Sequence, residues 1–170
     1  LMKYAGEDGV AAYGVLMYVN LVFLALFIGY SIGTAPITGY NYGAKNHAEL
    51  KNILKKSSVI IGIFAVCMLL LAKVLSRPLA EIFVGYDKSL FNLTLRGFKI
   101  FSFAFLFSGV SIYGSSFFTA LNNGLISALI SFLRTLVLQI SAVLILPLIL
   151  GIDGIWISIV VAEFMSMLIT

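Results

Sequence analysis

Residues 135–152 read TLVLQISAVLILPLILGI, and this stretch decides the class of fold. It has no charged side chain, and as a helix rising about 1.5 Å per residue it nearly crosses the ~30 Å hydrocarbon core of a bilayer. A transmembrane strand would instead show about 10 residues of alternating polarity, which this stretch lacks. The stretch therefore predicts a membrane-spanning helix.

Outside it, uncharged stretches of the same kind cover much of the 170 residues, at 9–44, 57–72 and 100–133. Only 11% of the residues are charged and 61% are apolar, whereas a soluble domain has about 25% charged residues because its surface faces water. The composition excludes an ordinary soluble domain and predicts an all-α polytopic bundle in a lipid bilayer. Hydropathy places five spanning helices at about 10–38, 57–75, 94–120, 125–150 and 154–170.

Two of the connections between these helices are long and polar. Residues 40–56 hold four lysines and are expected to form a connector outside the bilayer. Residues 76–92 are expected to lie along the membrane surface, because apolar residues recur there on one face at helical spacing. Asp87 is the predicted N-cap of the third helix. The apolar face consists of Leu79, Ile82 and Phe83.

The other two connections, 122–124 and 151–154, are short turns. Consecutive helices joined by so few residues run antiparallel and touch along their length. We therefore expect the last three helices to pack against one another as one antiparallel group.

Small residues recur at every fourth position in the first and third helices, a spacing that lets helices approach closely in lipid. Two prolines near the ends of predicted spans either end a helix or act as a hinge. We expect packing roles for the small residues and leave both roles open for the prolines. The two rows are Ala25, Gly29 and Gly33, and Ser111, Ser115 and Thr119; the prolines are Pro36 and Pro147.

Two ionisable residues, Arg134 and Glu163, lie deep inside the predicted spans. An unpaired charge near the bilayer centre costs at least about 2.5 kcal/mol, so each needs a partner, water or neutralisation. The antiparallel hairpin offsets them by about seven residues, or roughly 10 Å along the helix axis. We therefore expect separate roles: Arg134 extends toward the turn at 122–124 or makes an interhelical contact, and Glu163 faces the bundle interior as a neutral acid or a proton or cation site.

Polar side chains on the first and third helices are further candidates for a substrate or ion pathway. Hydroxyl groups in such helices either line a cavity or hydrogen-bond to the preceding turn of their own backbone or to a neighbouring helix. The candidates are Asn20, Thr34, Ser111, Tyr113 and Ser115.

Several other classes of function lack the residues they need. The sequence offers no nucleophile paired with a base, and its single histidine, His47, and single cysteine, Cys67, cannot complete a metal-ligand set. The net charge of +4 is scattered over the span ends without a basic stripe for phosphate binding. We therefore expect no enzyme, no metal centre, no organic cofactor and no nucleic-acid partner.

Two segments resemble the multidrug and toxic compound extrusion (MATE) family. Residues 33–46, GTAPITGYNYGAKN, are similar to the loop after the second helix of a lobe in that family, and residues 134–163 resemble its final helical hairpin. The resemblance implies two six-helix lobes, of which this chain supplies the last five helices of the C-terminal one, with residues 1–8 as the tail of the helix before them. Residues 94–120 contain no Asp or Glu, whereas some relatives carry a cation-binding acid in the matching helix.

The resemblance further implies a secondary antiporter, coupled to Na⁺ or H⁺, that exports amphipathic and often cationic organic compounds by alternating access. It implies an N-terminal lobe as partner, a bacterial-type plasma membrane as location and a cytoplasmic position for residues 40–56. A lipid-linked saccharide flippase of the related superfamily and a non-catalytic membrane scaffold are the alternatives.

Overall fold

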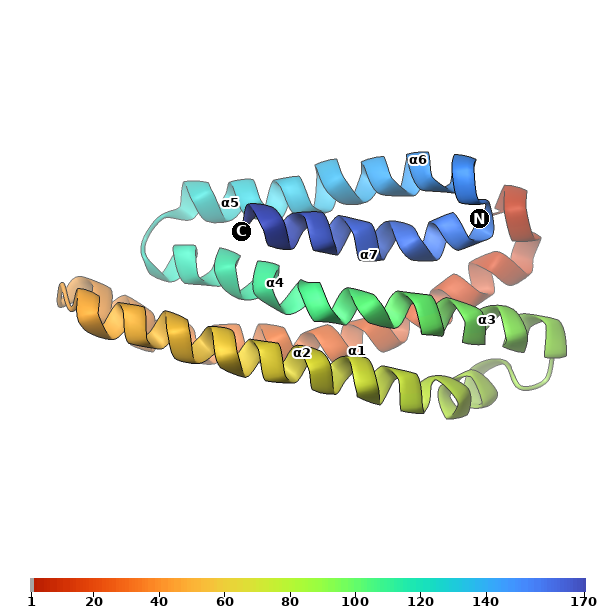
Figure 1. Ribbon diagram of the computed structural model, residues 1–170, viewed down its shortest axis with the longest axis horizontal. Helices are drawn as coiled ribbons and strands as arrows, with labels where there is room; N and C mark the ends of the chain where they lie inside the picture. Colours follow the sequence, from red (N-terminus) through yellow and green to blue (C-terminus); the bar gives the residue numbers. More distant parts are fainter. Residues whose placement is uncertain (1) are drawn as a thin grey trace.

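The structure is a computed structural model that describes residues 2–170, and over those residues it consists of helices joined by short turns (Figure 1). Five continuous helical rods are long and apolar enough to cross a membrane, which confirms the predicted fold class. The rods are α1 (Met2–Gly43); α2 (His47–Val84); α3 (Lys88–Phe101), η1 (Ser102–Ala104) and α4 (Phe105–Ala120); α5 (Gly124–Phe132), the π-helix η2 (Leu133–Gln139) and α6 (Ile140–Leu150); and α7 (Ile152–Ile169).

The five rods lie side by side, with α2 along one edge of the view in Figure 1 and the α5–α6 rod along the other. Helix α4 contacts α1, α2, α5 and α7, so it is the central element of the bundle. The last three rods run antiparallel and pack together as the short turns predict. Helix α1 is kinked at Gly6, where the backbone leaves helical geometry with φ 56° and ψ −145°.

The predicted connector at 40–56 is wrong, because helix already covers most of it. Helix α1 continues to Gly43 through Pro36, and α2 begins at His47. The Asn46 side chain caps α2 by accepting a hydrogen bond from the backbone N–H of Glu49 at 3.2 Å. The lysines at 51, 55 and 56 therefore lie on the first turns of a helix, and a tight turn replaces the expected loop.

The predicted surface segment at 76–92 is also wrong, because α2 runs on through Pro78 to Val84 and keeps packing against the bundle. Its buried residues continue at four-residue spacing, and they include Ala72, Ser76, Ala80 and Val84. The predicted N-cap is confirmed: Asp87 Oδ1 accepts hydrogen bonds from the backbone N–H groups of Ser89 (2.7 Å) and Leu90 (3.1 Å).

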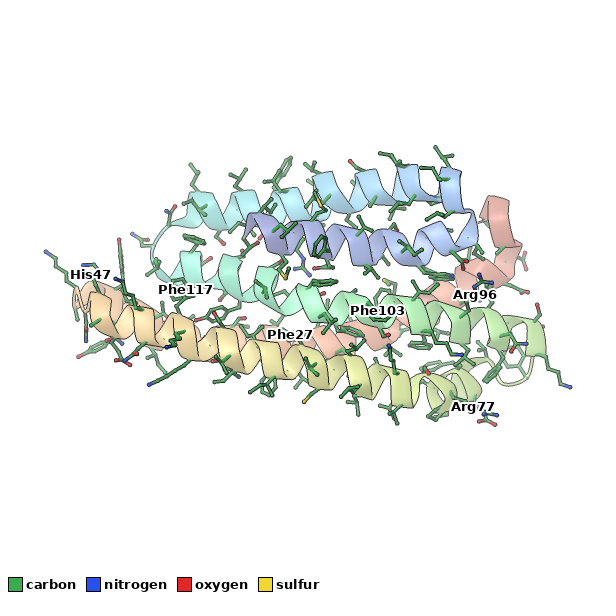
Figure 2. All side chains as sticks on the ribbon, in the orientation of Figure 1. Phe27, His47, Arg77, Arg96, Phe103 and Phe117 are labelled. Carbon is green, nitrogen blue, oxygen red and sulfur yellow. The ribbon has the colours of Figure 1, made fainter. Side chains whose placement is uncertain are left out.

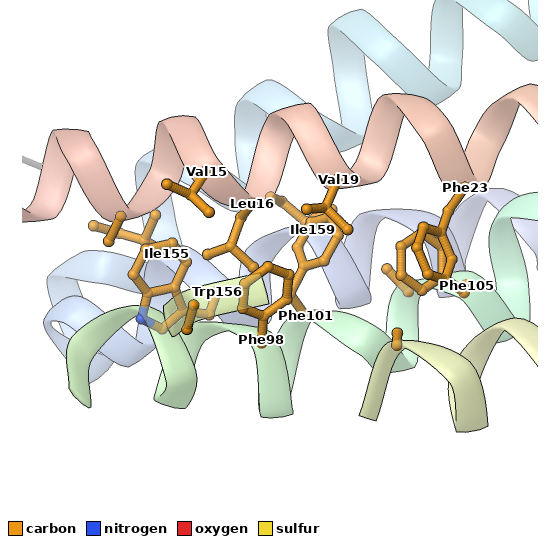
Figure 3. Close-up of a cluster of buried hydrophobic side chains, with 14 of the residues drawn as sticks. Val15, Leu16, Val19, Phe23, Phe98, Phe101, Phe105, Ile155, Trp156 and Ile159 are labelled. Carbon is orange, nitrogen blue, oxygen red and sulfur yellow. The ribbon is translucent and has the colours of Figure 1, made fainter. Parts of the chain in front are cut away.

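The largest cluster of buried apolar side chains joins α1, α2, α3, α4 and α7 (Figure 3). Trp156 on α7 has no exposed surface, and its ring stacks on Tyr13 with centroids 6.3 Å apart. Gly97 on α3 makes room for it, since a Cβ there would lie 3.3 Å from the indole and 2.7 Å from Leu16 Cδ1. Close packing of this kind matters because lipid supplies little hydrophobic drive for helix association.

The two rows of small residues lie in different surroundings. The row on α4 packs against α5, where Ser115 Oγ lies 2.9 Å from both Ser127 Oγ and Ser131 Oγ. The row on α1 is exposed, and nothing lies within 4 Å of where a Cβ at Gly29 or Gly33 would stand. The packing role of that row stays a prediction, because the described part of the chain places no partner against it.

Both prolines lie within continuous helices. Pro36 is inside α1 well before its end, and Pro147 is in the last turn of α6, where its carbonyl oxygen accepts a hydrogen bond from Gly151 N at 3.0 Å. Gly151 then turns the chain with φ 60°, a conformation that favours glycine. A hinge role for either proline stays a prediction.

Candidate functional site

Arg134 and Glu163 form an ion pair between η2 and α7. The Arg134 Nη2 donates to Glu163 Oε1 at 2.8 Å, and Nε lies 3.1 Å from both carboxylate oxygens. The side chains are 20% and 11% exposed. The expectation of separate roles, with Arg134 extending toward the turn at 122–124, is therefore wrong, whereas the alternative of an interhelical contact for Arg134 is confirmed. The geometry is that of a charge-assisted pair, which is stronger than a hydrogen bond between neutral groups.

The π-helix η2 accounts for part of this difference. It contains Arg134, and its i→i+5 bonding places one more residue in the turn than an α-helix would. One additional residue rotates the helix before it by about 100° relative to the helix after it and shortens the axial distance. Long side chains on both residues then cover the remaining offset. The offset of roughly 10 Å expected from the sequence was too large, because it assumed a uniform α-helix.

A cavity of about 400 Å³ lies next to this ion pair, between α1, α4, α5 and η2. Arg134 is the one charged residue among those that line it. The other lining residues are apolar or carry hydroxyl groups: Leu24, Ile28, Ser111, Ile112, Ser115, Ser116, Thr119, Ile130 and Ser131. Glu163 is not among them, so the cavity meets the cationic partner of the pair.

The hydroxyl groups of the cavity differ in how well they are paired. Ser115 and Ser131 bond to each other, and Thr119 Oγ1 donates to Ser127 Oγ at 2.7 Å. Ser111 is 1% exposed, and its Oγ has no hydrogen-bond partner among the described residues. Buried hydroxyl groups normally have a partner. Four in the described residues do not, those of Thr94, Ser111, Tyr113 and Ser166, and of these Ser111 is the one that lines the cavity.

The structure brings together three of the predicted pathway residues, Ser111, Ser115 and Arg134, with Glu163 behind Arg134. Thr34 instead donates to backbone carbonyl oxygens of its own helix, at 3.0 and 3.1 Å. The remaining two candidates, Asn20 and Tyr113, also do not line the cavity; Tyr113 is buried against aromatic rings. The functional roles of all of these residues stay predictions.

Sequence reasoning missed Ser131 as a lining residue. Its position three residues before Arg134 places the two on one helix face, which is a signal that could have found it. The apolar lining from α1 carried no such signal, because Leu24 and Ile28 look like any lipid-facing residues in sequence.

The labelled His47 lies at one end of the bundle, and Arg77 and Arg96 lie toward the other end (Figure 2). Arg96 pairs with Asp153 across α3 and α7, where the two side chains are 63% and 26% exposed. Within residues 2–170, no group of three or more His, Cys, Asp or Glu residues could hold a metal ion.

A family model described as MatE matches residues 1–145. The chain belongs to the MatE family. No curated protein matches it by sequence. As a MatE protein with five apolar helices, the chain is an integral membrane protein.

Solved structures of MATE transporters share the fold of this MatE chain. It aligns with an outward-facing multidrug resistance MATE family transporter of the MOP superfamily at a TM-score of 0.91 and 19% identity, covering 98% of this chain and 38% of that one. An inward-facing conformation of such a transporter gives 0.89 and 20%, covering 98% and 39%. The Vibrio cholerae MATE transporter VcmN in its bent form gives 0.89 and 19%, covering 96% and 37%. The chain thus spans about two fifths of the length of these transporters.

Proposed function

We propose that this MatE chain is the C-terminal lobe of a secondary antiporter that exports amphipathic organic compounds by alternating access. The observation that carries the proposal is that the same five-helix arrangement matches an outward-facing transporter and an inward-facing one almost equally well, with TM-scores of 0.91 and 0.89. A lobe that keeps its internal packing in both states can rock as one body against a second lobe.

The packing of the bundle supports movement as one body. Helix α4 touches four neighbours, and the cluster around Trp156 joins α1, α3 and α7. Such a unit resists internal rearrangement, so the relative motion falls at its outer faces. The exposed small residues of α1 provide one face at which an N-terminal lobe or a further helix can approach closely.

We further propose Na⁺ or H⁺ as the coupling ion, a bacterial-type plasma membrane as the location and a cytoplasmic position for the turn between α1 and α2. Arg134 and Glu163 are the intramembrane charges of this lobe within the described residues, so Glu163 is the candidate for contact with the coupling ion. A saccharide flippase is less well supported, because the cavity has a single arginine and a pyrophosphate needs a strongly cationic site.

The test is transport by the full-length protein in proteoliposomes. An inward or outward gradient of Na⁺ or H⁺ is imposed, and accumulation of a fluorescent organic ion is followed in the wild type and in Glu163→Gln. We expect gradient-driven flux in the wild type and reduced flux in the variant. Absence of flux under either gradient would contradict the antiporter, while unchanged flux in Glu163→Gln would remove only this residue from coupling.

A further inference from the structure

The charge that faces the cavity between α1, α4 and α5 is positive. Glu163 engages Nε and Nη2 of Arg134, and Nη1 makes no hydrogen bond to any described residue. A guanidinium group has five N–H donors, so several remain for another acceptor. The lining includes Arg134 but no Asp or Glu, so Glu163 is outside it. The pair is neutral as a whole, and of its two residues only the cationic one lines the cavity.

The Ser111 hydroxyl is a second feature of the lining, independent of the ion pair. It lines the same cavity, is 1% exposed and has no partner among residues 2–170. A buried hydroxyl without a partner is unfavourable in an apolar environment, so an acceptor in the cavity would stabilise it. Ser111 and Arg134 come from different helices, and both line one cavity.

The rest of the lining includes apolar side chains, which indicate that the ligand also has an apolar part. Leu24 and Ile28 from α1 and Ile112 from α4 provide apolar surface next to the donors. A ligand that fits both parts has a compact anionic group and a hydrocarbon or aromatic body. An organic cation would place its charge beside Arg134 with no carboxylate lining the cavity, an arrangement that costs free energy in a low-dielectric site.

We propose that this cavity binds an amphipathic organic anion, a carboxylate or sulfonate, with its charged group at Arg134 and Ser111 and its apolar body against α1. This inference rests on the proposed transport function and specifies the charge of the compound that this lobe accepts. It differs from the expectation of cationic cargo, because the residues that would hold a cation are absent from the lining.

The experiment compares two dyes of the same tricyclic shape and opposite charge. Fluorescein is an anion and rhodamine 123 is a cation, and each is titrated with purified full-length protein in detergent while fluorescence anisotropy is recorded. We expect fluorescein to bind at least about 10-fold more tightly, since one charge-assisted hydrogen bond accounts for about that ratio. Equal binding of both dyes, or tighter binding of rhodamine 123, would overturn the proposal.

Variants identify the residues responsible. The double variant Arg134→Gln, Glu163→Gln removes both charges together and so leaves no buried charge unpaired; it is expected to weaken fluorescein binding by about 10-fold or more. Ser111→Ala is expected to weaken it by about 3- to 10-fold. Arg96→Gln removes one positive charge from the exposed pair with Asp153 and is the matched control, with unchanged binding expected. Unchanged fluorescein affinity in both the double variant and Ser111→Ala would overturn the proposal.

These assays distinguish failure of the proposed anion site from failure of the proposed transport function. If a gradient drives rhodamine 123 transport while fluorescein does not bind, the antiporter stands and the anion site is refuted. If fluorescein binds at Arg134 and no gradient moves either dye, the site stands and the transport function is refuted.

Discussion

Removing one partner of the Arg134–Glu163 pair is expected to destabilise the protein more than removing both. Each side chain is largely buried, and three donor–acceptor contacts of 2.8 to 3.1 Å join the two groups. Glu163→Gln leaves a guanidinium without its counterion, and Arg134→Gln leaves a carboxylate. Each single variant should therefore lose about 2.5 kcal/mol of unfolding free energy, the lower end of the range for an uncompensated charge in a bilayer.

The double variant Arg134→Gln, Glu163→Gln replaces the ion pair by two neutral amides that hydrogen-bond across the same space. We expect it to lose about 2 kcal/mol, so that the two substitutions depart from additivity by about 3 kcal/mol. Unfolding of the full-length protein is titrated with sodium dodecyl sulfate in mixed micelles and followed by circular dichroism. The four proteins of the cycle are compared under one set of conditions.

The exposed pair Arg96–Asp153 provides a control cycle in the same chain. Its side chains are 63% and 26% exposed, so its interaction energy should stay below about 1 kcal/mol. Additive effects at Arg134 and Glu163, within about 0.5 kcal/mol, would refute the reasoning, because the contacts seen between the two groups would then carry no coupling.

Three further variants or modifications test other parts of the fold. Gly154→Ala should destabilise by about 1–3 kcal/mol in the same titration, because its Cβ would overlap the carbonyl oxygen of Leu146, while Gly62→Ala, with nothing within 4 Å, should not destabilise. Asp87→Ala should cost about 1 kcal/mol by loss of an N-cap, and an equal stability would contradict that role. Cys67 lies on the exposed face of a membrane-spanning helix, so a water-soluble maleimide should label it in denatured protein and not in proteoliposomes; rapid labelling of both would place α2 in water.

Much of the fold could be predicted from sequence because local patterns determine it. The uncharged stretches indicate helices, the residues at 122–124 and 151–154 permit tight turns and nothing longer, and Asp87 has the side chain that an N-cap requires. These features depend on neighbouring residues only.

The connectors and the ion pair could not be predicted in the same way. Lysines at 45, 51, 55 and 56 indicate a polar segment, but a charged surface is compatible with a helix that extends beyond the bilayer, and Asn46 caps that helix. Pro78 lies in the predicted surface segment, yet α2 continues through it. The partner of Arg134 depends on the π-helix η2, and no residue in 133–139 distinguishes it from an α-helix by type.

The candidate site was predicted in part for a related reason. Ser111 and Ser115 share a helix face by spacing, so their proximity follows from sequence. The approach of Arg134 and of α1 to that face is a tertiary contact, set by how three helices pack. Thr34 has the same chemistry as Ser111, but its orientation directs the hydroxyl to its own backbone.

The single tryptophan of this chain sits among α1, α3 and α7 without solvent exposure, and this gives the lobe an optical reporter of its own. Trp156 is seven residues from Glu163 on α7, or about 10 Å along the axis, and it does not line the cavity. A red shift of its emission therefore records exposure of the indole as these helices separate.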